Sequence, residues 1–524
     1  MSARAHATSP DQSNTGWPPG IPYIIGNEGC ERFSFYGMRS ILTLYLAEVL
    51  YARHPAFAAA PEAFARSHFH LFVAGVYALP MVGAVISDRL LGKYRTILWL
   101  SVVYAAGNLA LALLPDSTWG VWTGLALIST GSGGIKPCVS AHVGDQFGRA
   151  NWFRLRTIYQ AFYFIVNFGS FFATLLIPWI WHRFGIRVAF GLPGVLMLIA
   201  TAVFWMGRNV FVHVPPKPGG RLGLYDAATS TAFFLAFGHL FFTAGRPWPV
   251  LLAVSAGFVA LGVVLFRRRQ AIAPDEGFLA VLLYALGAWL RKPTRGFFAS
   301  ATERFGAATV EGPVAVLRIV SVFLLVSLFW SLFDQHGSSW ILQAKMMDLQ
   351  LWGDTKVLPS QVQAANPLLV MLLIPFTQKL VFPGLERLGI PLTPLRRMTA
   401  GMVLTALSFV SAALVQAAID RGPPTSVWFG WQMVAYVLIT LGEVLVSITG
   451  LEFAYSQAPR RMKSTIMGFW LLTVSLGNVL VSIIARIALP LGKSFWLFAG
   501  LMAAAAVLFA VRARFYTPRD YVQE

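Results

Sequence analysis

Residues 83–95 read Gly-Ala-Val-Ile-Ser-Asp-Arg-Leu-Leu-Gly-Lys-Tyr-Arg and form a basic loop between two apolar segments. The glycines would let neighbouring helices approach closely. Asp88, Arg89, Lys93 and Arg95 would form a cluster of charges at the surface of a membrane. We therefore expect this loop to join two membrane-spanning helices of a larger bundle.

The composition of the whole chain is that of an integral membrane protein. Of its 524 residues, 56% are hydrophobic and only 12% are charged, whereas soluble domains contain about 25% charged residues. A soluble chain of this length would divide into roughly three or four domains joined by polar linkers. The sequence instead shows a succession of apolar stretches, each long enough to cross a bilayer, which takes about 20 residues.

These stretches predict fourteen spanning helices. They lie near residues 21–50, 70–91, 96–114, 120–143, 157–181, 187–207, 225–243, 248–266, 314–342, 360–381, 398–417, 427–456, 464–487 and 493–511. A polar stretch from Arg267 to about Gly312 separates the eighth span from the ninth. Its apolar residues 278–290 are flanked by basic ones, a pattern typical of a helix that lies on the membrane face.

Positive charge gathers in the loops that follow every second span and in the segment after the last span. Examples are Lys93/Arg95, Arg149/Arg154/Arg156, Arg267 to Arg269, Arg396/Arg397 and Arg460/Arg461/Lys463. Such loops are cytoplasmic under the positive-inside rule, so we expect both termini on the cytoplasmic side. The formal net charge of +19 therefore indicates membrane orientation and not nucleic-acid binding.

The first residues of the chain and its cysteines add little to the prediction of the fold. The first twenty residues are polar and lack the pattern of a removable signal peptide. The only two cysteines, Cys30 and Cys138, lie inside apolar segments and imply no disulfide framework.

The order of the spans predicts an all-α polytopic protein built from two six-helix bundles and a two-helix insertion. We expect a cytoplasmic tail at 1–20, the first bundle at 21–212, the hairpin insertion with a cytoplasmic linker at 213–312, the second bundle at 313–512 and a cytoplasmic tail at 513–524. Two six-helix bundles with a substrate site between them are the plan of major facilitator transporters. The loop 83–95 resembles the loop signature of that superfamily. The alternative is a fourteen-helix protein of another kind.

The first span carries four ionisable residues, Glu28, Glu31, Arg32 and Arg39. Each ionisable residue in the middle of a span costs about 2.5–3.5 kcal/mol, so it indicates function. Positions 28, 32, 36 and 39 share one helical face, and Glu31 borders it. Two carboxylates beside one guanidinium cannot both be ionised cheaply, so we expect one of them to bind a proton. The alternative is a static ion-pair cluster that orders the bundle.

A further cation, Lys136, stands in the otherwise apolar stretch Thr130-Gly-Ser-Gly-Gly-Ile-Lys-Pro137. The glycines would let a neighbouring backbone approach, and Pro137 would open a local kink. Because an unpaired ammonium would be costly here, we expect Glu28, Glu31 or a negative group of the substrate as its partner.

The second half carries the opposite charge, with Asp334 and Glu443 inside spans and no Lys or Arg in the middle of one. One wall of the space between the halves would therefore be positive and the other negative. A short peptide, with its separated ammonium and carboxylate, complements such a field. A plainer interpretation, compatible with transport, is that Arg39–Asp334 and Lys136–Glu443 are salt bridges between the bundles.

Three stretches carry a family resemblance. Glu28-Gly-Cys-Glu-Arg-Phe-Ser-Phe-Tyr-Gly37 resembles the E-x-x-E-R-F-x-Y-Y-G signature of the proton-dependent oligopeptide transporter (POT) family. The stretches Gly133–Ser140 with Phe162–Ser170, and Gly450–Pro459, resemble later segments of that family. The similarity runs from about Gly26 to Gly477, outside the insertion, and the extra hairpin resembles that of bacterial members.

The resemblance implies a proton-coupled symporter that imports di- and tripeptides by alternating access through the bacterial inner membrane. It implies a functional monomer that uses protons as the coupling ion and holds no metal or other cofactor. Proton coupling is implied for Glu28, Glu31, Arg32, Lys136 and Asp334. Substrate binding is implied for Arg39, Tyr36, Tyr77, Lys136, Tyr163, Asn167, Trp330, Asn366, Glu443 and Trp470. Gate salt bridges are implied for Arg39, Asp334, Lys136 and Glu443. Taken alone, each aromatic residue would more commonly pack in a core.

The sequence departs from the family pattern at two positions. Phe35 replaces the first tyrosine of the signature and removes a hydroxyl. His70, placed here at the start of span 2, matches a histidine of animal peptide carriers and is either a proton relay or an interfacial structural residue.

Other functions have less support in the sequence. Members of the family also carry nitrate or peptide-like solutes, but nitrate has no ammonium for Glu443 to receive. A drug exporter would tolerate a less polar cavity. The nine histidines show no metal-ligand spacing and no P-loop is present, so neither an enzyme nor an ATP-driven pump is indicated.

Overall fold

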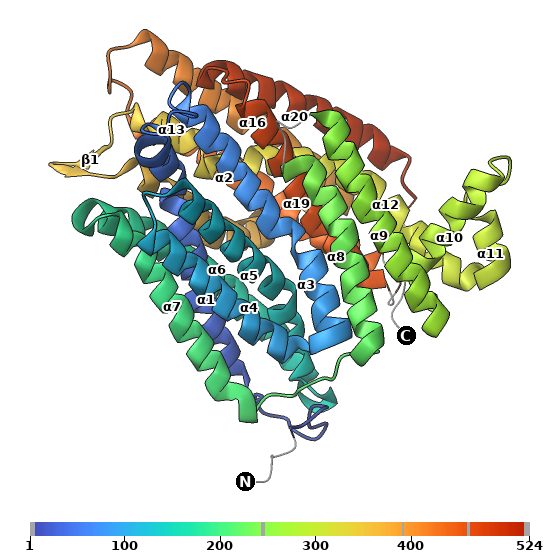
Figure 1. Cartoon of the computed structure of the whole chain (residues 1–524). Coiled ribbons are helices and arrows are strands. Elements are labelled where there is room, and N and C mark those ends of the chain that lie inside the picture. The colour runs from blue at the N-terminus through green and yellow to red at the C-terminus, as the bar shows by residue number, and fades with distance from the viewer. Residues whose placement is uncertain (1–5, 243–246, 390–391, 458, 460–461, 518–524) are drawn as a thin grey trace.

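The computed structural model describes residues 6–242, 247–389, 392–457, 459 and 462–517 and is almost entirely helical (Figure 1). The first half contains α1 (Ile21–Leu44), η1 (Tyr45–Tyr51), α2 (Pro61–Ala78), α3 (Pro80–Ile86), η2 (Ser87–Leu91), α4 (Lys93–Leu113), α5 (Thr118–Asp145), η3 (Arg149–Arg154), α6 (Leu155–Phe184), α7 (Ile186–Met206) and η4 (Gly207–Asn209). The middle contains α8 (Gly220–Phe242), α9 (Trp248–Ile272), α10 (Phe278–Arg291) and α11 (Ala299–Phe305).

The second half has the same helical character. It contains α12 (Ala307–Phe333), η5 (Asp334–Gly337), α13 (Ser339–Lys345), η6 (Pro359–Ala364), α14 (Ala365–Phe376), η7 (Thr377–Val381), α15 (Phe382–Arg387), α16 (Pro394–Arg421), η8 (Phe429–Trp431), α17 (Gln432–Glu443), η9 (Val444–Ile448), α18 (Thr449–Ser456), α19 (Lys463–Ala485) and α20 (Leu491–Arg514). Between α13 and η6, strands β1 (Gln350–Trp352) and β2 (Thr355–Lys356) form a small antiparallel hairpin.

Each of the fourteen predicted spans coincides with helix over the residues that the structure describes. Eleven of the helices in this part are long and apolar enough to cross a membrane. The other three predicted spans correspond to α1, α5 and α8, of 24, 28 and 23 residues. At about 1.5 Å per residue these also exceed the roughly 30 Å of a bilayer core. The predicted start of span 2 was wrong, because α2 begins at Pro61, so His70 lies within the helix.

Residues 83–95, predicted as a loop, are helical except for Gly92, because they form the end of α3, η2 and the start of α4. They bring helices together as expected. A Cβ added at Gly83 would lie 2.5 Å from the Cα of Gly134 in α5, so only glycine permits this approach. The expected charge cluster has carboxylate partners from elsewhere in the chain. Lys93 Nζ lies 2.7 Å from Asp145 Oδ2, and Arg89 Nη1 lies 3.3 Å from Asp226 Oδ2 of α8.

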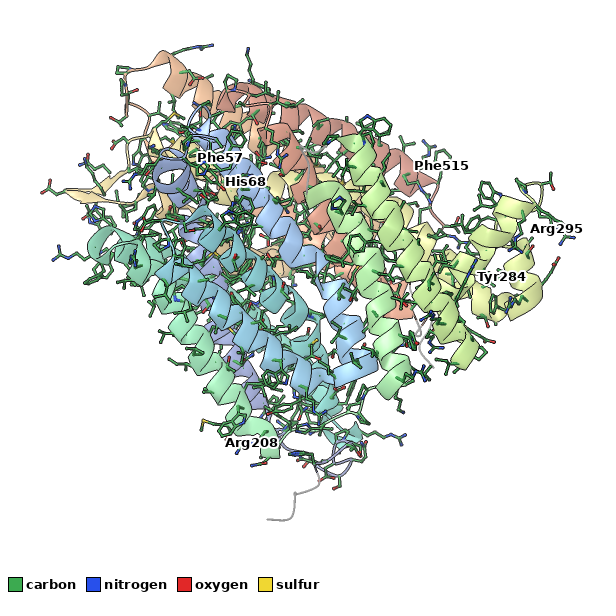
Figure 2. The ribbon with its side chains drawn as sticks, in the orientation of Figure 1. Phe57, His68, Arg208, Tyr284, Arg295 and Phe515 are labelled. Atoms are coloured by element: carbon green, nitrogen blue, oxygen red, sulfur yellow. The ribbon has the colours of Figure 1, made fainter. Side chains whose placement is uncertain are left out.

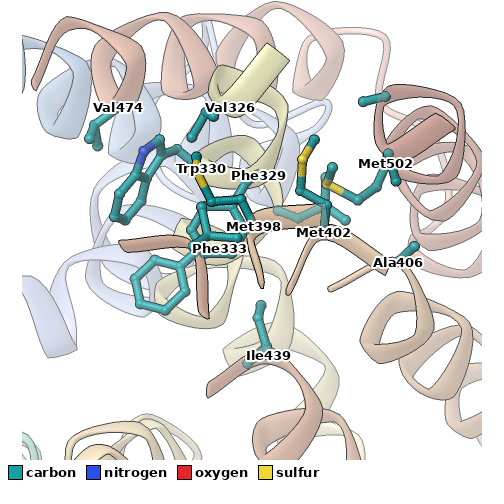
Figure 3. Packing of buried hydrophobic residues seen from close by; sticks show 14 of the residues in the cluster. Val326, Phe329, Trp330, Phe333, Met398, Met402, Ala406, Ile439, Val474 and Met502 are labelled. Atoms are coloured by element: carbon teal, nitrogen blue, oxygen red, sulfur yellow. The ribbon is translucent and has the colours of Figure 1, made fainter. Parts of the chain in front are cut away.

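Two large hydrophobic cores, together with two small clusters, hold the described part of the molecule together. One is formed by residues of the first half, between Ile21 and Phe211, and the other by residues of the second half, between Val316 and Tyr516. Figure 3 shows part of the second core, where Phe329, Trp330 and Phe333 of α12 pack close to Met398 and Met402 of α16. The two bundles meet along α2 and α19, so the space between them is bordered by both cores.

The middle helices lie beside these bundles. Helices α8 and α9 pack against each other, and α8 contacts α3. Helices α10 and α11 project to one side of the molecule (Figure 1), where Tyr284 and Arg295 are labelled in Figure 2. A small core that includes Val281 and Ala301 holds these two helices, and Phe278 at the start of α10 also packs against the second core.

Candidate functional site

The ionisable residues of α1 form a compact buried cluster. Arg32 Nε lies 2.7 Å from Glu28 Oε1 and 3.3 Å from Glu31 Oε2. Glu31 is only 1% exposed, and its Oε1 accepts a hydrogen bond of 3.0 Å from Ser132 Oγ of α5. The structure therefore places both carboxyl groups beside one guanidinium, the arrangement in which double ionisation is costly.

Lys136 projects from α5 between two aromatic rings. Its Nζ lies 4.2 Å from the ring centroid of Tyr77 and 4.4 Å from that of Phe35. The nitrogen is buried, and within the described part of the chain it has no hydrogen-bond partner. The expected pairing with Glu28 or Glu31 and the bridge to Glu443 are therefore not formed here. The ring faces attract the ammonium instead.

Arg39 and Asp334 form the expected bridge between the bundles. Arg39 Nη2 of α1 lies 2.6 Å from Asp334 Oδ1 at the end of α12, and both residues are at most 5% exposed. Asn478 Nδ2 of α19 donates to Asp334 Oδ2 at 2.7 Å. Both oxygens of the Asp334 carboxylate therefore have a donor, which such a buried charge requires.

His70 joins the same network and crosses between the bundles. Its Nδ1 lies 2.6 Å from Asn478 Oδ1 and its Nε2 lies 2.7 Å from Ser338 Oγ. The imidazole is fully buried. The sequence placed His70 at the membrane interface; it lies instead inside the contact between α2 and α19, because α2 starts about two and a half turns earlier than expected.

Further polar contacts join the bundles at the end of the molecule that holds the C-terminus of α1 and the N-terminus of α2, which we call the distal end. Thr43 Oγ1 donates to the carbonyl of Gly337 at 2.8 Å, and Ser67 Oγ lies 3.0 Å from Ser482 Oγ. Beyond them, Lys345 Nζ lies 2.7 Å from Glu48 Oε1. The two bundles are therefore held together at the distal end.

Glu443 lies in the second bundle, at the end of α17. Its Oε2 accepts a hydrogen bond of 3.0 Å from Asn366 Nδ2 of α14. The same amide group also lies 3.2 Å from Thr440 Oγ1. Glu443 interacts electrostatically with Tyr36, Tyr163 and Arg39 of the first bundle. Arg39 in turn interacts electrostatically with Lys136, so Arg39 is within electrostatic range of both Glu443 and Lys136.

The other predicted residues differ in exposure. Tyr163 is 43% exposed, whereas Trp330 and Trp470 are buried in the second core with their rings edge to face at 6.2 Å. Figure 3 shows Trp330 among the apolar side chains of that core. Asn167 donates to the carbonyl of Tyr163 on its own helix at 2.9 Å. For the two tryptophans, core packing is the interpretation that the geometry favours.

Three partners of the charged residues were missed by the sequence analysis: Ser132, Ser338 and Asn478. All three are buried polar residues in apolar helices or next to one. A buried polar residue within an apolar helix is a weak signal for a hydrogen bond to another helix. The signal indicates that a partner exists and not which residue it is.

Comparisons with known proteins identify the family of this chain. The family model described as "PTR2: POT family" matches residues 94–268 and 279–516. "Peptide transporter family 1" of Drosophila melanogaster is 34% identical over 419 residues, which cover 77% of this chain and 48% of that protein. The chain thus spans about half the length of that relative. "Solute carrier family 15 member 1" of Oryctolagus cuniculus is 26% identical, with 96% of this chain and 93% of that protein covered.

Solved structures are similar over nearly the whole chain. A crystal structure of an "auto inhibited POT family peptide transporter" has a TM-score of 0.80 at 37% identity and covers 97% of this chain and 99% of its own. The POT family transporter PepTSo has a TM-score of 0.79 at 41% identity and covers 96% and 99%. With the two bundles, the eleven membrane-length apolar helices among the described residues and the family model over most of its length, this chain is a multi-pass membrane protein with the major facilitator fold and belongs to the POT family, a family of transporters and not of enzymes.

Proposed function

We propose that this chain is a proton-coupled symporter that imports di- and tripeptides by alternating access. One observation carries the proposal. Lys136, a buried ammonium without a hydrogen-bond partner in the described residues, and Glu443, a carboxylate that accepts from a neutral amide, both interact electrostatically with the Arg39 guanidinium. A short peptide brings the two charges that this arrangement lacks, at the two ends of one molecule.

The peptide would bind with its carboxylate toward Lys136 and Arg39 and its ammonium toward Glu443. Asn366 would keep the Glu443 carboxylate oriented, because its amide donates to one of the two oxygens. Tyr36 and Tyr77 lie beside these charges and would contact the peptide backbone and side chains. Nitrate and other simple anions would leave Glu443 unsatisfied, so a zwitterion is favoured over them.

Protons would control the contact between the bundles. A proton on Asp334 would remove its charge and weaken the bond of 2.6 Å to Arg39, which helps to hold the distal end closed. A proton on Glu28 or Glu31 would leave Arg32 with one carboxylate and would let the α1 cluster rearrange around the bound peptide. Proton and peptide would then be released on the same side, and no other cofactor is required.

The same proposal implies a membrane, an orientation in it and an oligomeric state for the protein. The basic loops would face the cytoplasm of a bacterium and the distal end would face outward from its inner membrane. One chain contains both bundles and therefore one complete set of the charged residues, so a monomer in the lipid bilayer would be sufficient for transport.

Uptake of labelled dialanine into proteoliposomes tests the proposal. We expect accumulation that requires an inward proton gradient or membrane potential. The variant Glu443→Gln should lose its preference for peptides with a free amino end over N-acetylated ones by about tenfold or more, because the charged hydrogen bond to the ammonium is lost. Accumulation that persists without any gradient would contradict coupling, and an unchanged preference in Glu443→Gln would contradict the assigned polarity.

A further inference from the structure

Behind Glu31, the core of the first bundle contains polar atoms that no protein group satisfies. Tyr104 Oη, Ser101 Oγ and both side-chain polar atoms of Asn27 are buried and have no hydrogen-bond partner among the residues that the structure describes. All three residues have zero exposure. Glu31 Oε2 is in the same condition, apart from the ion pair with Arg32.

The contacts that α7 makes with α1 and α4 show that the polar atoms of Asn27, Ser101 and Tyr104 lie at similar heights along the bundle. The Ser34 hydroxyl of α1 donates to the carbonyl of Pro193 in α7, and the adjacent Gly194 lies against Asn108 of α4. Nearer the N-terminus of α1, Gly26 lies against Val203 of α7.

The aromatic rings of Tyr94 in α4 and Phe204 in α7 stack at 5.5 Å at this second level. Positions 27–31 of α1 are therefore level with about the middle of the stretch 94–108 of α4, where Ser101 and Tyr104 lie.

Electrostatic interactions and packing contacts also place Tyr104 at the height of Glu31. Tyr104 interacts electrostatically with Glu31 and Arg32, and a Cβ added at Gly131, next to Ser132, would lie 2.5 Å from the Tyr104 Cβ. Asn27 is four residues before Glu31 and shares its helical face. The charged or titratable groups around Glu31 include Glu28, Arg32 and Tyr36 of α1, Lys136 of α5 and Tyr104 of α4.

The polar line continues toward the end of the bundle that holds the N-terminus. There His142 of α5 is buried, and its Nε2 has no hydrogen-bond partner in the described residues. Its ring lies 5.8 Å from that of Phe204 and 5.1 Å from that of Phe211. His142 interacts electrostatically with His213 and Lys93 beside the loops at this end.

We propose that buried water molecules, bound by Glu31, Tyr104, Ser101 and Asn27, connect Glu31 to the cytoplasmic side through the interior of the first bundle. Buried polar groups without protein partners are the usual binding sites of internal water, which makes about three hydrogen bonds. The proton of the Glu31 carboxyl passes to the adjacent water, each following oxygen accepts one proton and releases another, and the last proton leaves near His142. The coupling proton thus reaches the cytoplasm separately from the peptide.

The inference rests on the proposed function, and one pair of assays distinguishes their failures. Labelled dialanine is measured in proteoliposomes as accumulation driven by a proton gradient and as counterflow, an exchange that needs no net proton movement. Tyr104→Phe, Asn27→Leu and Ser101→Ala remove the polar atoms with little change of shape. Tyr436→Phe, at a tyrosine of the second bundle that is 1% exposed, is the matched control.

We expect Tyr104→Phe and Asn27→Leu to reduce accumulation about tenfold, through loss of one hydrogen-bonded link, while counterflow stays within about twofold of the parent. Tyr436→Phe should change neither assay. Wild-type accumulation in both variants would overturn the water path. If both variants lose counterflow as well, Ser101→Ala, which removes a single oxygen, is measured in the same two assays. Reduced accumulation with normal counterflow would then support the water path, and wild-type accumulation would overturn it. A parent protein inactive in both assays would instead overturn the proposed function.

Discussion

The first bundle keeps five ionisable side chains close together (Glu28, Glu31, Arg32, Arg39 and Lys136), whereas in the second Asp334 and Glu443 each accept a hydrogen bond from an asparagine amide. In the first bundle a change of one proton alters several neighbours at once. In the second, each carboxylate accepts one hydrogen bond from a neutral amide, Asn478 or Asn366, so a proton on it alters fewer neighbours. The difference teaches that a proton acts on a connected cluster in the first bundle and on a single carboxylate in the second.

The largest effect is expected at the one bond that joins these two systems. Arg39→Met would leave Asp334 buried without its cation, and removal of one partner of a buried pair costs about 3–5 kcal/mol. We expect the distal end to open. The distance between spin labels at Leu114 and Trp352, which are 52% and 73% exposed, should increase in electron paramagnetic resonance measurements.

The double variant Arg39→Met/Asp334→Leu controls for this prediction. It removes both charges, so part of the closed distance distribution should return. Identical distributions in the parent and in Arg39→Met would mean that the bond does not hold the bundles together.

The second largest effect concerns Glu31. Glu31→Gln keeps the shape and the contact with Ser132 but cannot release a proton. Accumulation of dialanine against its gradient should fall about a hundredfold, the usual size of the loss of a proton-transferring group, while counterflow persists. Glu62→Gln, at an exposed carboxylate of α2, serves as the control. Undiminished accumulation by Glu31→Gln would remove the first bundle's role in coupling.

Much of the fold could be predicted from sequence because the membrane simplifies the problem. Each span must be helical to satisfy its backbone, so apolar stretches located the helices, and the basic loop 83–95 located a helix junction. The ends of the helices were less certain. Helix α2 begins at Pro61, and the prediction missed this start because polar residues such as Glu62 and Arg66 occupy the first turns and interrupt the apolar pattern.

The candidate site could be predicted only in part. Glu28, Glu31 and Arg32 are spaced along one helix, so their contact follows from helical geometry. The contacts of Lys136 with Phe35 and Tyr77, and of Asp334 with Asn478, depend on which faces of distant helices pack together. A single sequence contains no signal for that choice, so the sequence predicted charge partners for Lys136 where the fold supplies rings.

A smaller effect should distinguish how the two bundles hold their carboxylates. Asn478→Leu would remove the donor to one oxygen of the buried Asp334, which should lower stability by about 1–3 kcal/mol. Ser132→Ala removes the donor to Glu31, but Arg32 lies 3.3 Å from that carboxylate, so we expect only about 0.5–1.5 kcal/mol. Thermal unfolding in detergent compares the two variants. Equal losses would mean that the crowded cluster is no more tolerant than the isolated carboxylate.

The smallest effect is expected at the end of the first bundle that holds the N-terminus, where the tail folds back. The backbone N–H of His213 donates to the carbonyl of Ala7 at 2.7 Å, and the rings of His6 and His213 stack at 4.2 Å. Partial burial lowers the pKa of His213 below its usual value, although a hydrogen bond to the Arg208 carbonyl opposes the shift. The neutral imidazole is therefore favoured in the folded state.

A group whose pKa is lower in the folded than in the unfolded state stabilises the fold above its unfolded pKa, which is about 6.5 for histidine. This contribution is lost as the pH falls below that value, because the unfolded state then binds more protons. The protection factor of the His213 amide in hydrogen exchange should therefore decrease between pH 7.5 and pH 5.5. His213→Phe keeps an aromatic ring against His6 and should remove the part of this decrease that titration of His213 causes. If the protection factor decreases equally in the variant and the parent, His213 does not control how the tail responds to pH.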